Sequence, residues 1–201
     1  MFNIVCVTHR KLCENFFKRV GELYENNVPV ILREKDLSES EYEELAKKVI
    51  EICPNVILHS YINVAKKIGV KRIHLPLRLV NENVAKEFET VGVSVHSAEE
   101  AVLAEKNGAD YLGVGAVFHT GTKKDANSIS HETVKQICEA VNIPVIAIGG
   151  ISRENVIELQ GTGICGIAVV SAIFAAKNIT EATKELKELT KNMIQSCEAD
   201  R

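Results

Sequence analysis

The stretch Gly113-Val-Gly-Ala-Val-Phe-His-Thr-Gly-Thr-Lys-Lys-Asp125 is the part of the chain that first indicates its fold and its chemistry. It begins inside the apolar run Tyr111–Gly115, which has the length and composition of a buried strand. The residues that follow carry hydroxyl groups, two ammonium groups and a flexible glycine. Because hydroxyls and amides orient phosphate oxygens and lysine adds a positive charge, this strand end predicts a phosphate-binding loop.

Similar apolar runs recur along the chain and alternate with longer, charged segments of helical periodicity. The predicted strands are Asn3–Thr8, Pro29–Arg33, Asn55–His59, Arg72–Leu75, Gly92–Val95, Tyr111–Gly115, Val145–Gly149 and Gly166–Val170. The predicted helices are Lys11–Glu25, Ser38–Glu51, Ile62–Ile68, Asn83–Thr90, Ala98–Lys106, His131–Ala140, Arg153–Gln160 and Thr180–Ser196. This alternation predicts the α/β fold class and a single (β/α)₈ TIM barrel domain over residues 1–201. The alternative, an open flavodoxin-like sheet, usually has about five strands and leaves the other units unexplained.

Two serines are predicted to start helices. Ser38 is followed by Glu41, and Ser97 is followed by Glu100, which is the spacing of a capping box. In that arrangement the serine side chain and the acidic side chain each accept a hydrogen bond from the other residue's backbone N–H.

Composition and charge exclude several classes of protein. The 201 residues carry a formal net charge of -3, whereas a nucleic-acid-binding surface normally shows as a basic patch. The six cysteines are scattered, without a CxxC pair or the spacing of a zinc site. Cys6 and Cys165 lie in apolar runs and are expected to be buried in a reducing cytosol. The apolar segment Met1–Thr8 is too short to span a membrane and lacks the lead-in of a signal peptide. We therefore expect a cytoplasmic protein that binds neither nucleic acid nor membranes.

In a barrel of this kind the chemistry lies at the carboxyl ends of the strands. The residues found there are Arg33, Lys35, His59, Ser60, Ser94, His96, His119, Thr120, Thr122, Lys123, Gly149, Gly150, Val170 and Ser171. Gly149-Gly150 and Val170-Ser171 also precede predicted helices, whose free N–H groups and dipoles favour an anion. Together these groups predict a cationic bowl for one or two phosphate groups.

Arg33 and Lys35 alternate along an extended segment, so both side chains can point into the barrel mouth. The alternative is a surface ion pair with Glu34 or Asp36, which would leave them no part in the site. The loop after the sixth strand has a similar alternative, because polar loops with lysines are usually solvated connections. Three neighbouring loops with the same phosphate-binding character favour a binding site in both cases.

Five motifs, in this order, resemble the family of thiamine-phosphate synthases and TenI-type thiazole tautomerases. They are Leu32-Arg-Glu-Lys35, Gly92-Val-Ser-Val-His-Ser-Ala-Glu-Glu-Ala101, Gly108-Ala-Asp-Tyr-Leu-Gly-Val-Gly115, Thr120-Gly-Thr-Lys-Lys-Asp-Ala126 and Ile146-Ala-Ile-Gly-Gly-Ile151. The similarity covers nearly the whole chain and implies a (β/α)₈ barrel of thiamine biosynthesis. For the synthase it implies a reaction that joins hydroxymethylpyrimidine diphosphate to a thiazole phosphate and releases pyrophosphate.

The resemblance also implies two groups of substrate-binding residues. Arg33, Lys35 and Lys123 would contact the pyrophosphate, with Ser94 in the centre of the pocket. The residues that would hold the thiazole phosphate are Thr120, Thr122, Gly149 or Gly150, Val170 and Ser171.

Two segments depart from the synthase pattern. Synthases of this family resemble one another in an Asn-Asp pair after the third strand and a Gly-Gln-x-Asp run after the fourth, whose aspartates hold magnesium. The corresponding segments here read Ile57-Leu-His-Ser60 and His74-Leu-Pro-Leu-Arg-Leu79, so both carboxylates are missing. Magnesium prefers hard oxygen ligands, and we therefore expect no protein metal ligands and no firmly implied cofactor. Mg²⁺ would take part only if the protein is a synthase, carried by the diphosphate substrate.

A chain that lacks these carboxylates but keeps the loops for thiazole phosphate is more similar to the tautomerase branch of the family. That branch shifts a double bond in carboxythiazole phosphate and needs a proton shuttle but no metal. Its pattern has a histidine just after the glycine of the sixth strand, where this chain has Ala116. His119 and His59 are then the candidate catalytic acid–base groups, since histidine titrates near neutral pH. As alternatives, His119 is a simple phosphate ligand and His59 is a packed polar residue.

Three functions of different class remain open. The main expectation is a metal-independent, thiazole tautomerase-like isomerase that binds thiazole phosphate at the barrel mouth. The alternatives are a thiamine-phosphate synthase and a non-catalytic protein that binds thiamine intermediates. The presence of Arg33 and Lys35 favours a diphosphate or a second anionic group, such as a carboxylate on the thiazole. A homodimer formed by helix faces is a further expectation.

Lys123→Ala and Thr122→Ala are each expected to weaken binding of thiazole phosphate roughly tenfold or more, because each removes a hydrogen bond to a charged group. Isothermal titration calorimetry with the two variants and the parent protein measures the loss. Unchanged affinity in both variants would place the phosphate elsewhere.

Overall fold

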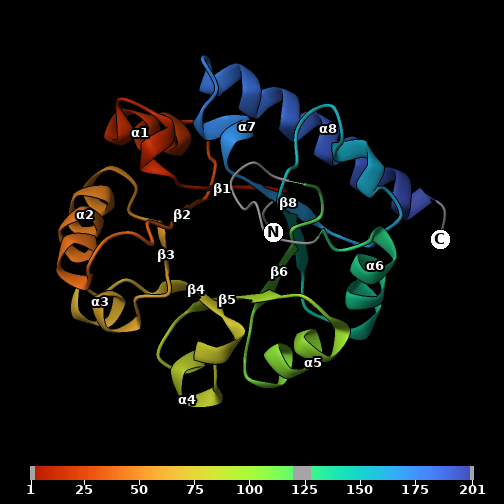
Figure 1. Cartoon of the computed structure of the whole chain (residues 1–201), viewed down its shortest axis with the longest axis horizontal. Coiled ribbons are helices and arrows are strands. Elements are labelled where there is room, and N and C mark those ends of the chain that lie inside the picture. Colours follow the sequence, from red (N-terminus) through yellow and green to blue (C-terminus); the bar gives the residue numbers. More distant parts are fainter. Residues whose placement is uncertain (1–2, 120–127, 200–201) are drawn as a thin grey trace.

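The computed structural model describes residues 3–119 and 128–199. In this part of the chain, parallel strands pair in sequence order and close into a barrel, in which β1 lies beside both β2 and β8 (Figure 1). The strands are β1 (Ile4–Val7), β2 (Val30–Leu32), β3 (Ile57–His59), β4 (Arg72–Pro76), β5 (Thr90–Val95), β6 (Tyr111–Gly115), β7 (Val145–Ile148) and β8 (Gly166–Val169). The (β/α)₈ barrel predicted from the sequence is confirmed.

Helices form a ring around the barrel (Figure 1). The α-helices are α1 (Phe16–Glu25), α2 (Glu39–Ile52), α3 (Ile62–Lys67), α4 (Glu82–Ala85), α5 (Ala98–Lys106), α6 (His131–Ala140), α7 (Ser171–Phe174) and α8 (Ile179–Ala199). Short 3-10 helices lie in the connections, namely η1 (Arg10–Leu12), η2 (Leu77–Leu79) and η3 (Val156–Leu159). Among the helices of the described ranges, none combines the length and the apolar character that a membrane span requires.

Alternation along the strands separates two apolar layers. The side chains that fill the inside of the barrel, which we call the interior plug, are Val5, Val7, Ile31, Ile57, Tyr111, Ile146 and Ala168. The residues between them, such as Ile4 and Cys6 of β1, face outward and pack in the larger core under the helices. Cys6 is fully buried there, as the sequence predicts, whereas Cys165 lies half-buried just before β8.

Both predicted caps form, but only one is a complete capping box. Ser38 Oγ accepts from Glu41 N at 3.4 Å, and Glu41 Oε2 accepts from Ser38 N at 2.8 Å. Ser97 Oγ accepts from Glu100 N at 3.3 Å. The carboxylate of Glu100 instead accepts from His96 N at 2.7 Å, so the reciprocal bond to the serine is replaced by one to the residue before it.

The predicted helix Arg153–Gln160 is wrong, because only the 3-10 helix η3 forms there. Asn155 bonds the local backbone twice, its Oδ1 accepting from Ser152 N at 2.8 Å and its Nδ2 donating to Gly150 O at 2.9 Å. Side-chain bonds of this kind compete with helical hydrogen bonds. The turn after β7 therefore does not supply the α-helix N-terminus that the sequence predicted beside Gly149 and Gly150.

Two other predicted helices have different limits. The segment 11–25 is divided into η1 and α1, since Cys13 between them has an extended backbone, with φ -148° and ψ 152°. The segment 83–90 is helical only within α4, and Thr90 instead begins β5. The N–H groups of Glu89 and Thr90 donate to Lys71 O at 2.8 and 3.2 Å, so the chain joins β4 at this point.

Two glycines make room for large side chains inside the barrel. A Cβ atom on Gly92 of β5 would lie 2.1 Å from Tyr111 Cζ and 2.5 Å from His74 Nδ1. A Cβ atom on Gly113 of β6 would lie 3.1 Å from His74 Cε1. The histidine of β4 and the tyrosine of β6 therefore occupy the space that side chains at the two glycine positions would need.

Gly92→Ala is expected to lower the free energy of unfolding by about 1–3 kcal/mol or more, because the added methyl group overlaps the tyrosine ring. Gly21→Ala in α1 is the matched control, since its Cβ would meet Ile52 Cγ2 at an ordinary 3.5 Å. The control is expected to gain roughly 0.5–1 kcal/mol from helix propensity. Urea denaturation followed by circular dichroism measures both changes, and a Gly92→Ala variant as stable as the parent would contradict this packing.

Candidate functional site

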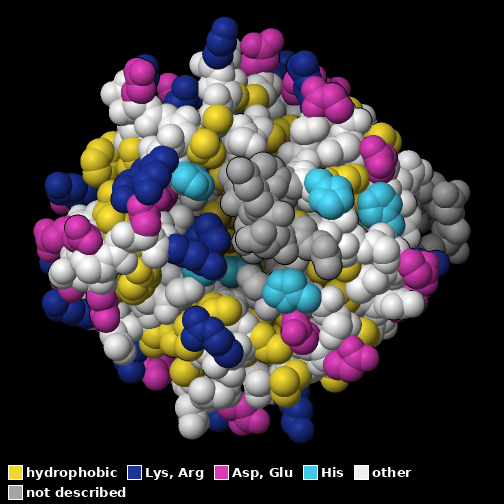
Figure 2. Space-filling view, viewed as in Figure 1, with side chains coloured by type: hydrophobic (Ala, Val, Ile, Leu, Met, Phe, Trp, Pro, Cys, Tyr) yellow, Lys and Arg dark blue, Asp and Glu magenta, His cyan; other side chains and the backbone are white. Residues whose placement is uncertain are grey.

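The carboxyl ends of the strands bring together several of the polar residues predicted for the barrel mouth. On the face shown in Figure 2, histidine and basic side chains surround the centre of the barrel. Arg33 directly follows β2, His59 ends β3, His74 lies in β4 and Ser94 lies in β5. We call these four residues the mouth cluster.

Arg33 has a positive charge that no described carboxylate neutralises. Its side chain is half-buried, and no salt bridge to it occurs in residues 3–119 and 128–199. Glu34 and Asp36, its partners in the alternative surface ion pair, both bind Arg10, at 3.1 and 2.8 Å. Burial lowers the pKa of the Arg33 guanidinium, against the smaller, raising effect of Glu34. A half-buried guanidinium group without a counter-ion among the described residues is suited to bind an anion.

A buried network in the segment after β1 holds Glu34 away from Arg33. Thr8 Oγ1 accepts from Arg33 N at 3.0 Å and donates to Glu34 Oε1 at 2.8 Å. Arg10 N also donates to Glu34 Oε1, at 3.0 Å, and the glutamate is only 4% exposed. Because side chains alternate along the extended chain, Arg33 and the exposed Lys35 point to the other side. Glu34, which lies between these two basic residues in the sequence, thus binds the segment that follows β1.

His59 is the last residue of β3 and is 9% exposed. Its Nδ1 lies 2.7 Å from Oγ of Ser60, which has a positive φ of 69°. The backbone N–H of His59 donates to Tyr42 OH of α2 at 3.1 Å, and this hydroxyl donates to Leu32 O at 2.6 Å. Helix α2 therefore ties the ends of β2 and β3 together, and His59 is a packed and hydrogen-bonded side chain. Its catalytic role stays a prediction.

His74 links the histidine of β3 to the serine of β5. Its ring stacks against that of His59, with 5.7 Å between the ring centroids. Its Nε2 lies 2.8 Å from Ser94 Oγ, and its Nδ1 lies 3.0 Å from Tyr111 OH. A neutral imidazole has one donor and one acceptor, which satisfies two such hydroxyl partners. A continuous set of polar contacts therefore forms the floor of the mouth.

Burial keeps both imidazoles uncharged at neutral pH. It lowers the pKa of His74 to about 4, with Arg33 as the smaller cause. It lowers the pKa of His59 to about 2, with further contributions from His74, Arg33 and Lys35. Among the described residues, the basic side chains that follow β2 therefore carry positive charge at the mouth, and these two histidines do not.

Gly149 and Gly150 directly follow β7 and pack against the residues that follow β6. Both have positive φ, 105° and 68°. A Cβ atom on Gly149 would lie 2.6 Å from Ala116 Cα, and one on Gly150 would lie 2.7 Å from His119 O. Phe118 N donates to Gly149 O at 3.0 Å. Residues 116–119 and the two glycines are thus packed backbone against backbone, and the side chain of His119 is exposed.

The remaining predicted phosphate ligands are only partly described. Val170 is the N-cap residue, and Ser171 is the first residue, of the short helix α7. Thr120, Thr122 and Lys123 lie outside the described residues, so their part in the site stays a prediction.

The donor atoms at the ends of β3 and β4 do not fit magnesium. They are the imidazole nitrogens of His59 and His74 and the hydroxyl of Ser60, where oxygen-rich, charged ligands are needed. Glu34 of the neighbouring segment is already bound by Arg10. Within residues 3–119 and 128–199, no group of three or more histidine, cysteine or acidic side chains is arranged to hold a metal ion. We therefore assign no magnesium ligand in this part of the protein.

His74 and Tyr111 are parts of the site that the sequence analysis did not single out. His74 lies on β4 and Tyr111 on β6, and both side chains point into the barrel. Gly92 lies on β5 between them, and Gly113 on β6 lies next to the His74 ring. A histidine within an otherwise apolar strand, with glycines at inward positions of the next two strands, is the sequence signal that could have identified them.

A closed barrel with a polar floor, and with an arginine that has no carboxylate partner among the described residues at the carboxyl ends of its strands, defines the class of TIM-barrel enzymes. The chain matches the family described as "Thiamine monophosphate synthase" over residues 4–173, and it belongs to that family of enzymes.

Known proteins are similar in sequence to most of this chain. The thiamine-phosphate synthase of Clostridium tetani is 43% identical over 165 residues, which cover 78% of this chain and 79% of that protein. The thiamine-phosphate synthase of Clostridium acetobutylicum is 36% identical over 202 residues, which cover 94% and 95%. A solved structure, thiamine phosphate pyrophosphorylase from Pyrococcus furiosus, has a TM-score of 0.83 at 32% identity and covers 96% of this chain and 97% of that chain. The resemblance inferred from the five motifs is confirmed at the level of the family.

Acid is expected to destabilise the protein in part through His74. Its pKa of about 4 in the folded protein lies below the roughly 6.5 of an unperturbed histidine, so the unfolded chain binds the extra proton more readily. The stability that depends on the neutral ring is complete above about pH 6.5 and is lost as the pH falls toward 4. Over this range the loss is on the order of 3 kcal/mol.

His74→Gln keeps a hydrogen-bonding side chain that cannot be protonated, so the difference in unfolding free energy between pH 7 and pH 4 should shrink. His96→Gln is the control, because the side chain of His96 is exposed, and it should keep the pH dependence of the parent. Urea denaturation across this pH range measures both. A His74→Gln profile parallel to that of the parent would contradict the lowered pKa.

Proposed function

We propose that the protein is a thiamine-phosphate synthase, which joins hydroxymethylpyrimidine diphosphate to a thiazole phosphate. The observation that carries this proposal is the near full-length similarity to proteins of that name, such as the Clostridium acetobutylicum relative with 36% identity. In the reaction, the carbon–oxygen bond to the diphosphate breaks and pyrophosphate leaves with the electron pair. A carbon–nitrogen bond to the thiazole forms. The isomerase expected from the sequence becomes the second candidate.

Arg33 supports a diphosphate at the rim formed by β2. Its guanidinium group is half-buried and has no carboxylate partner in the described residues. Lys35, which shares the same side of the extended segment, adds a second positive charge. Negative charge grows on the leaving oxygen as the bond breaks, so a fixed cation stabilises the transition state more than the bound substrate.

The polar floor supports the binding of a substrate ring above it. Ser94 Oγ is held by His74 Nε2 at 2.8 Å, and the other ring nitrogen of this histidine lies 3.0 Å from Tyr111 OH. Alkylation of the thiazole nitrogen leaves a positive charge on that ring. Because burial keeps His74 neutral, the floor orients the ring without repelling the cation that forms.

The thiazole phosphate is proposed to bind across the mouth from Arg33, at the ends of β6, β7 and β8. Gly149, Gly150, Val170 and Ser171 are its described contacts in this proposal, and Thr120, Thr122 and Lys123 complete it from the sequence. The positive φ angles of the two glycines and their close packing against residues 116–119 fix the backbone at this edge of the mouth. We derive no step through magnesium, since the described residues do not fit it.

A thiazole tautomerase-like isomerase is the second candidate, and one observation favours it. The segments 57–60 and 74–79, where synthases of the family carry metal-binding carboxylates, contain none here, and the first of them includes the neutral imidazole of His59. An imidazole can accept and return a proton, whereas a carboxylate pair would serve a metal, and the burial that lowers the pKa of His59 makes the exposed His119 the better base of the two. In this reaction His59 or the exposed His119 moves the proton.

The test incubates the purified protein with hydroxymethylpyrimidine diphosphate, thiazole phosphate and Mg²⁺, and follows thiamine phosphate and pyrophosphate over time. Both products are expected in equal amounts, and a parallel sample with EDTA measures the contribution of metal carried by the substrate. Arg33→Gln is expected to lower kcat/KM roughly 10- to 100-fold, because a hydrogen bond to a charged group contributes about 1.5–3 kcal/mol.

Arg72→Gln is the matched control, since Arg72 begins β4 at the other end of the barrel and should not affect the rate. Absence of thiamine phosphate, with thiazole phosphate still binding in calorimetry, would overturn the synthase proposal. An isomerisation assay with His59→Gln and His119→Gln would then test the second candidate.

A further inference from the structure

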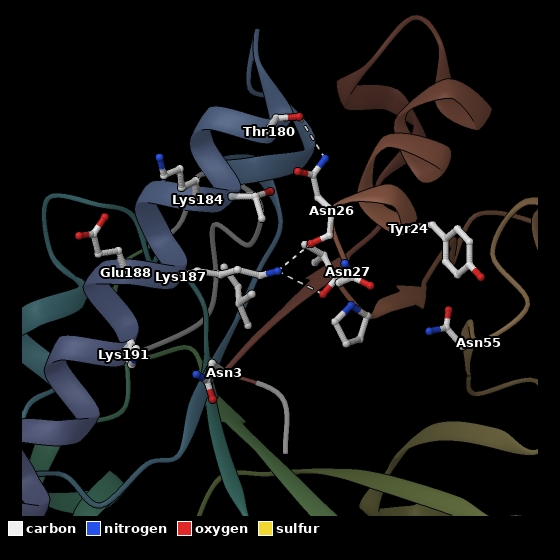
Figure 3. Close-up of a pocket in the computed structure, with 14 residues that line it drawn as sticks. Asn3, Tyr24, Asn26, Asn27, Asn55, Thr180, Lys184, Lys187, Glu188 and Lys191 are labelled. Atoms are coloured by element: carbon white, nitrogen blue, oxygen red, sulfur yellow. Dashed lines mark hydrogen bonds between the residues drawn. The ribbon is translucent and has the colours of Figure 1, made fainter.

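A cavity of about 920 Å³ lies at the end of the barrel opposite the mouth cluster. It is open to solvent and is bordered by α8, the carboxyl end of α1 and the starts of the first strands (Figure 3). Three of the lining residues lie at the starts of strands. Asn3 directly precedes β1, Pro29 directly precedes β2, and Asn55 lies just before β3. Parallel strands begin at the same end of a barrel, so the cavity is separate from the mouth. Its volume is within the range of about 300–1,000 Å³ that is typical of small-molecule sites.

The lining combines positive charge with hydrogen-bond donors. Lys184, Lys187 and Lys191 follow one another along the cavity side of α8 (Figure 3). Glu188 is the one carboxylate among the described lining residues, which leaves an excess of two positive charges. The amide side chains that line the cavity are those of Asn3, Asn26, Asn27 and Asn55. Apolar surface comes from Ile4, Val28 and Pro29.

Thr183 is the observation that indicates a ligand. Its side chain lines the cavity and is 2% exposed, yet its Oγ1 has no hydrogen-bond partner in the described residues. A buried hydroxyl left unpaired costs free energy, and native proteins normally supply a partner. A ligand with acceptor atoms in the cavity would supply one.

The lysines also lack acidic partners. Within the described ranges, Lys184, Lys187 and Lys191 form no salt bridge, although the helix surfaces elsewhere carry several. Lys187 Nζ donates to Asn26 O at 2.7 Å and to Asn27 O at 3.2 Å, which holds α8 against the end of α1. Burial lowers the pKa of Lys187, because these carbonyl groups do not replace a full negative charge.

We propose that this cavity binds a phosphorylated small molecule. Its phosphate oxygens accept hydrogen bonds from Thr183 Oγ1 and from the ammonium groups of α8, and its apolar part packs on Val28 and Pro29. A phosphate dianion offsets the excess of two positive charges and has several acceptor oxygens, whereas a carboxylate offsets only one. The site does not depend on the reaction that occurs at the mouth.

Inorganic phosphate is the probe, titrated into ¹⁵N-labelled protein at constant ionic strength with chloride as the reference. Saturable shifts are expected in the backbone amide signals of residues 180–191, separate from any shifts at Arg33 or Gly149. Thr183→Val should weaken this binding roughly tenfold or more, since it removes a hydrogen bond to a charged group. The double variant Lys184→Ala, Lys191→Ala should weaken it as well, while Lys48→Ala, Lys135→Ala, on α2 and α6, should not.

Thr190→Val is the matched control for the threonine. Thr190 lies on the same helix, is 0% exposed and also has an unpaired hydroxyl in the described residues, but it does not line the cavity. Both valine variants should raise Tm by a few degrees in phosphate-free buffer, because each removes an unsatisfied buried hydroxyl. Only Thr183→Val should lose the phosphate-dependent shifts. Undiminished binding in Thr183→Val, or no saturable shift in the parent at residues 180–191, would overturn the proposal.

Discussion

The contact of His74 with Tyr111 inside the barrel is the constraint on which the floor of the mouth depends. It exists because Gly92 has no side chain where the two rings meet, at distances that leave no room for a Cβ. His74, held from below, then fixes Ser94 and stacks against His59. Burial in this packing lowers the pKa of both imidazoles and keeps them neutral. The absence of a side chain at Gly92 of β5 therefore affects the charge of a surface formed by β3 and β4.

The charge of the mouth depends on a second, independent arrangement. Glu34 lies between two basic residues, and in isolation it would be their natural counter-ion. Thr8 and Arg10, in the segment after β1, bind it instead, which leaves Arg33 without a carboxylate partner among the described residues. The neutral floor and the charged rim thus arise from different strands and different interactions. A substrate with one anionic end and one aromatic ring matches this division.

The sequence was sufficient for the barrel and for the location of its mouth, because buried parallel strands are continuous apolar runs whose ends are easy to see. It was insufficient where a single side chain competes with the backbone, as Asn155 does in the segment after β7. His74 and Tyr111 were not singled out either, because their contacts come from other strands, and the inward glycines of β5 and β6 were the only hint of them in the sequence. Arg33 was identified, but its freedom from Glu34 depends on Arg10, which is distant in the sequence. The motifs indicated the family, whereas the choice between its two reactions depends on atoms at the ends of β3 and β4.

The interior plug has a consequence for the molecule as a whole. The barrel is filled between its two ends by side chains such as Val5, Ile31, Ile57 and Ile146. The strands therefore surround a packed core that separates the two ends, and not a channel. Each rim can therefore acquire or lose residues without altering what the other rim contacts. A chain of this size can in this way evolve two independent faces, one that converts a substrate and one that binds a second ligand, without a linker or an added domain.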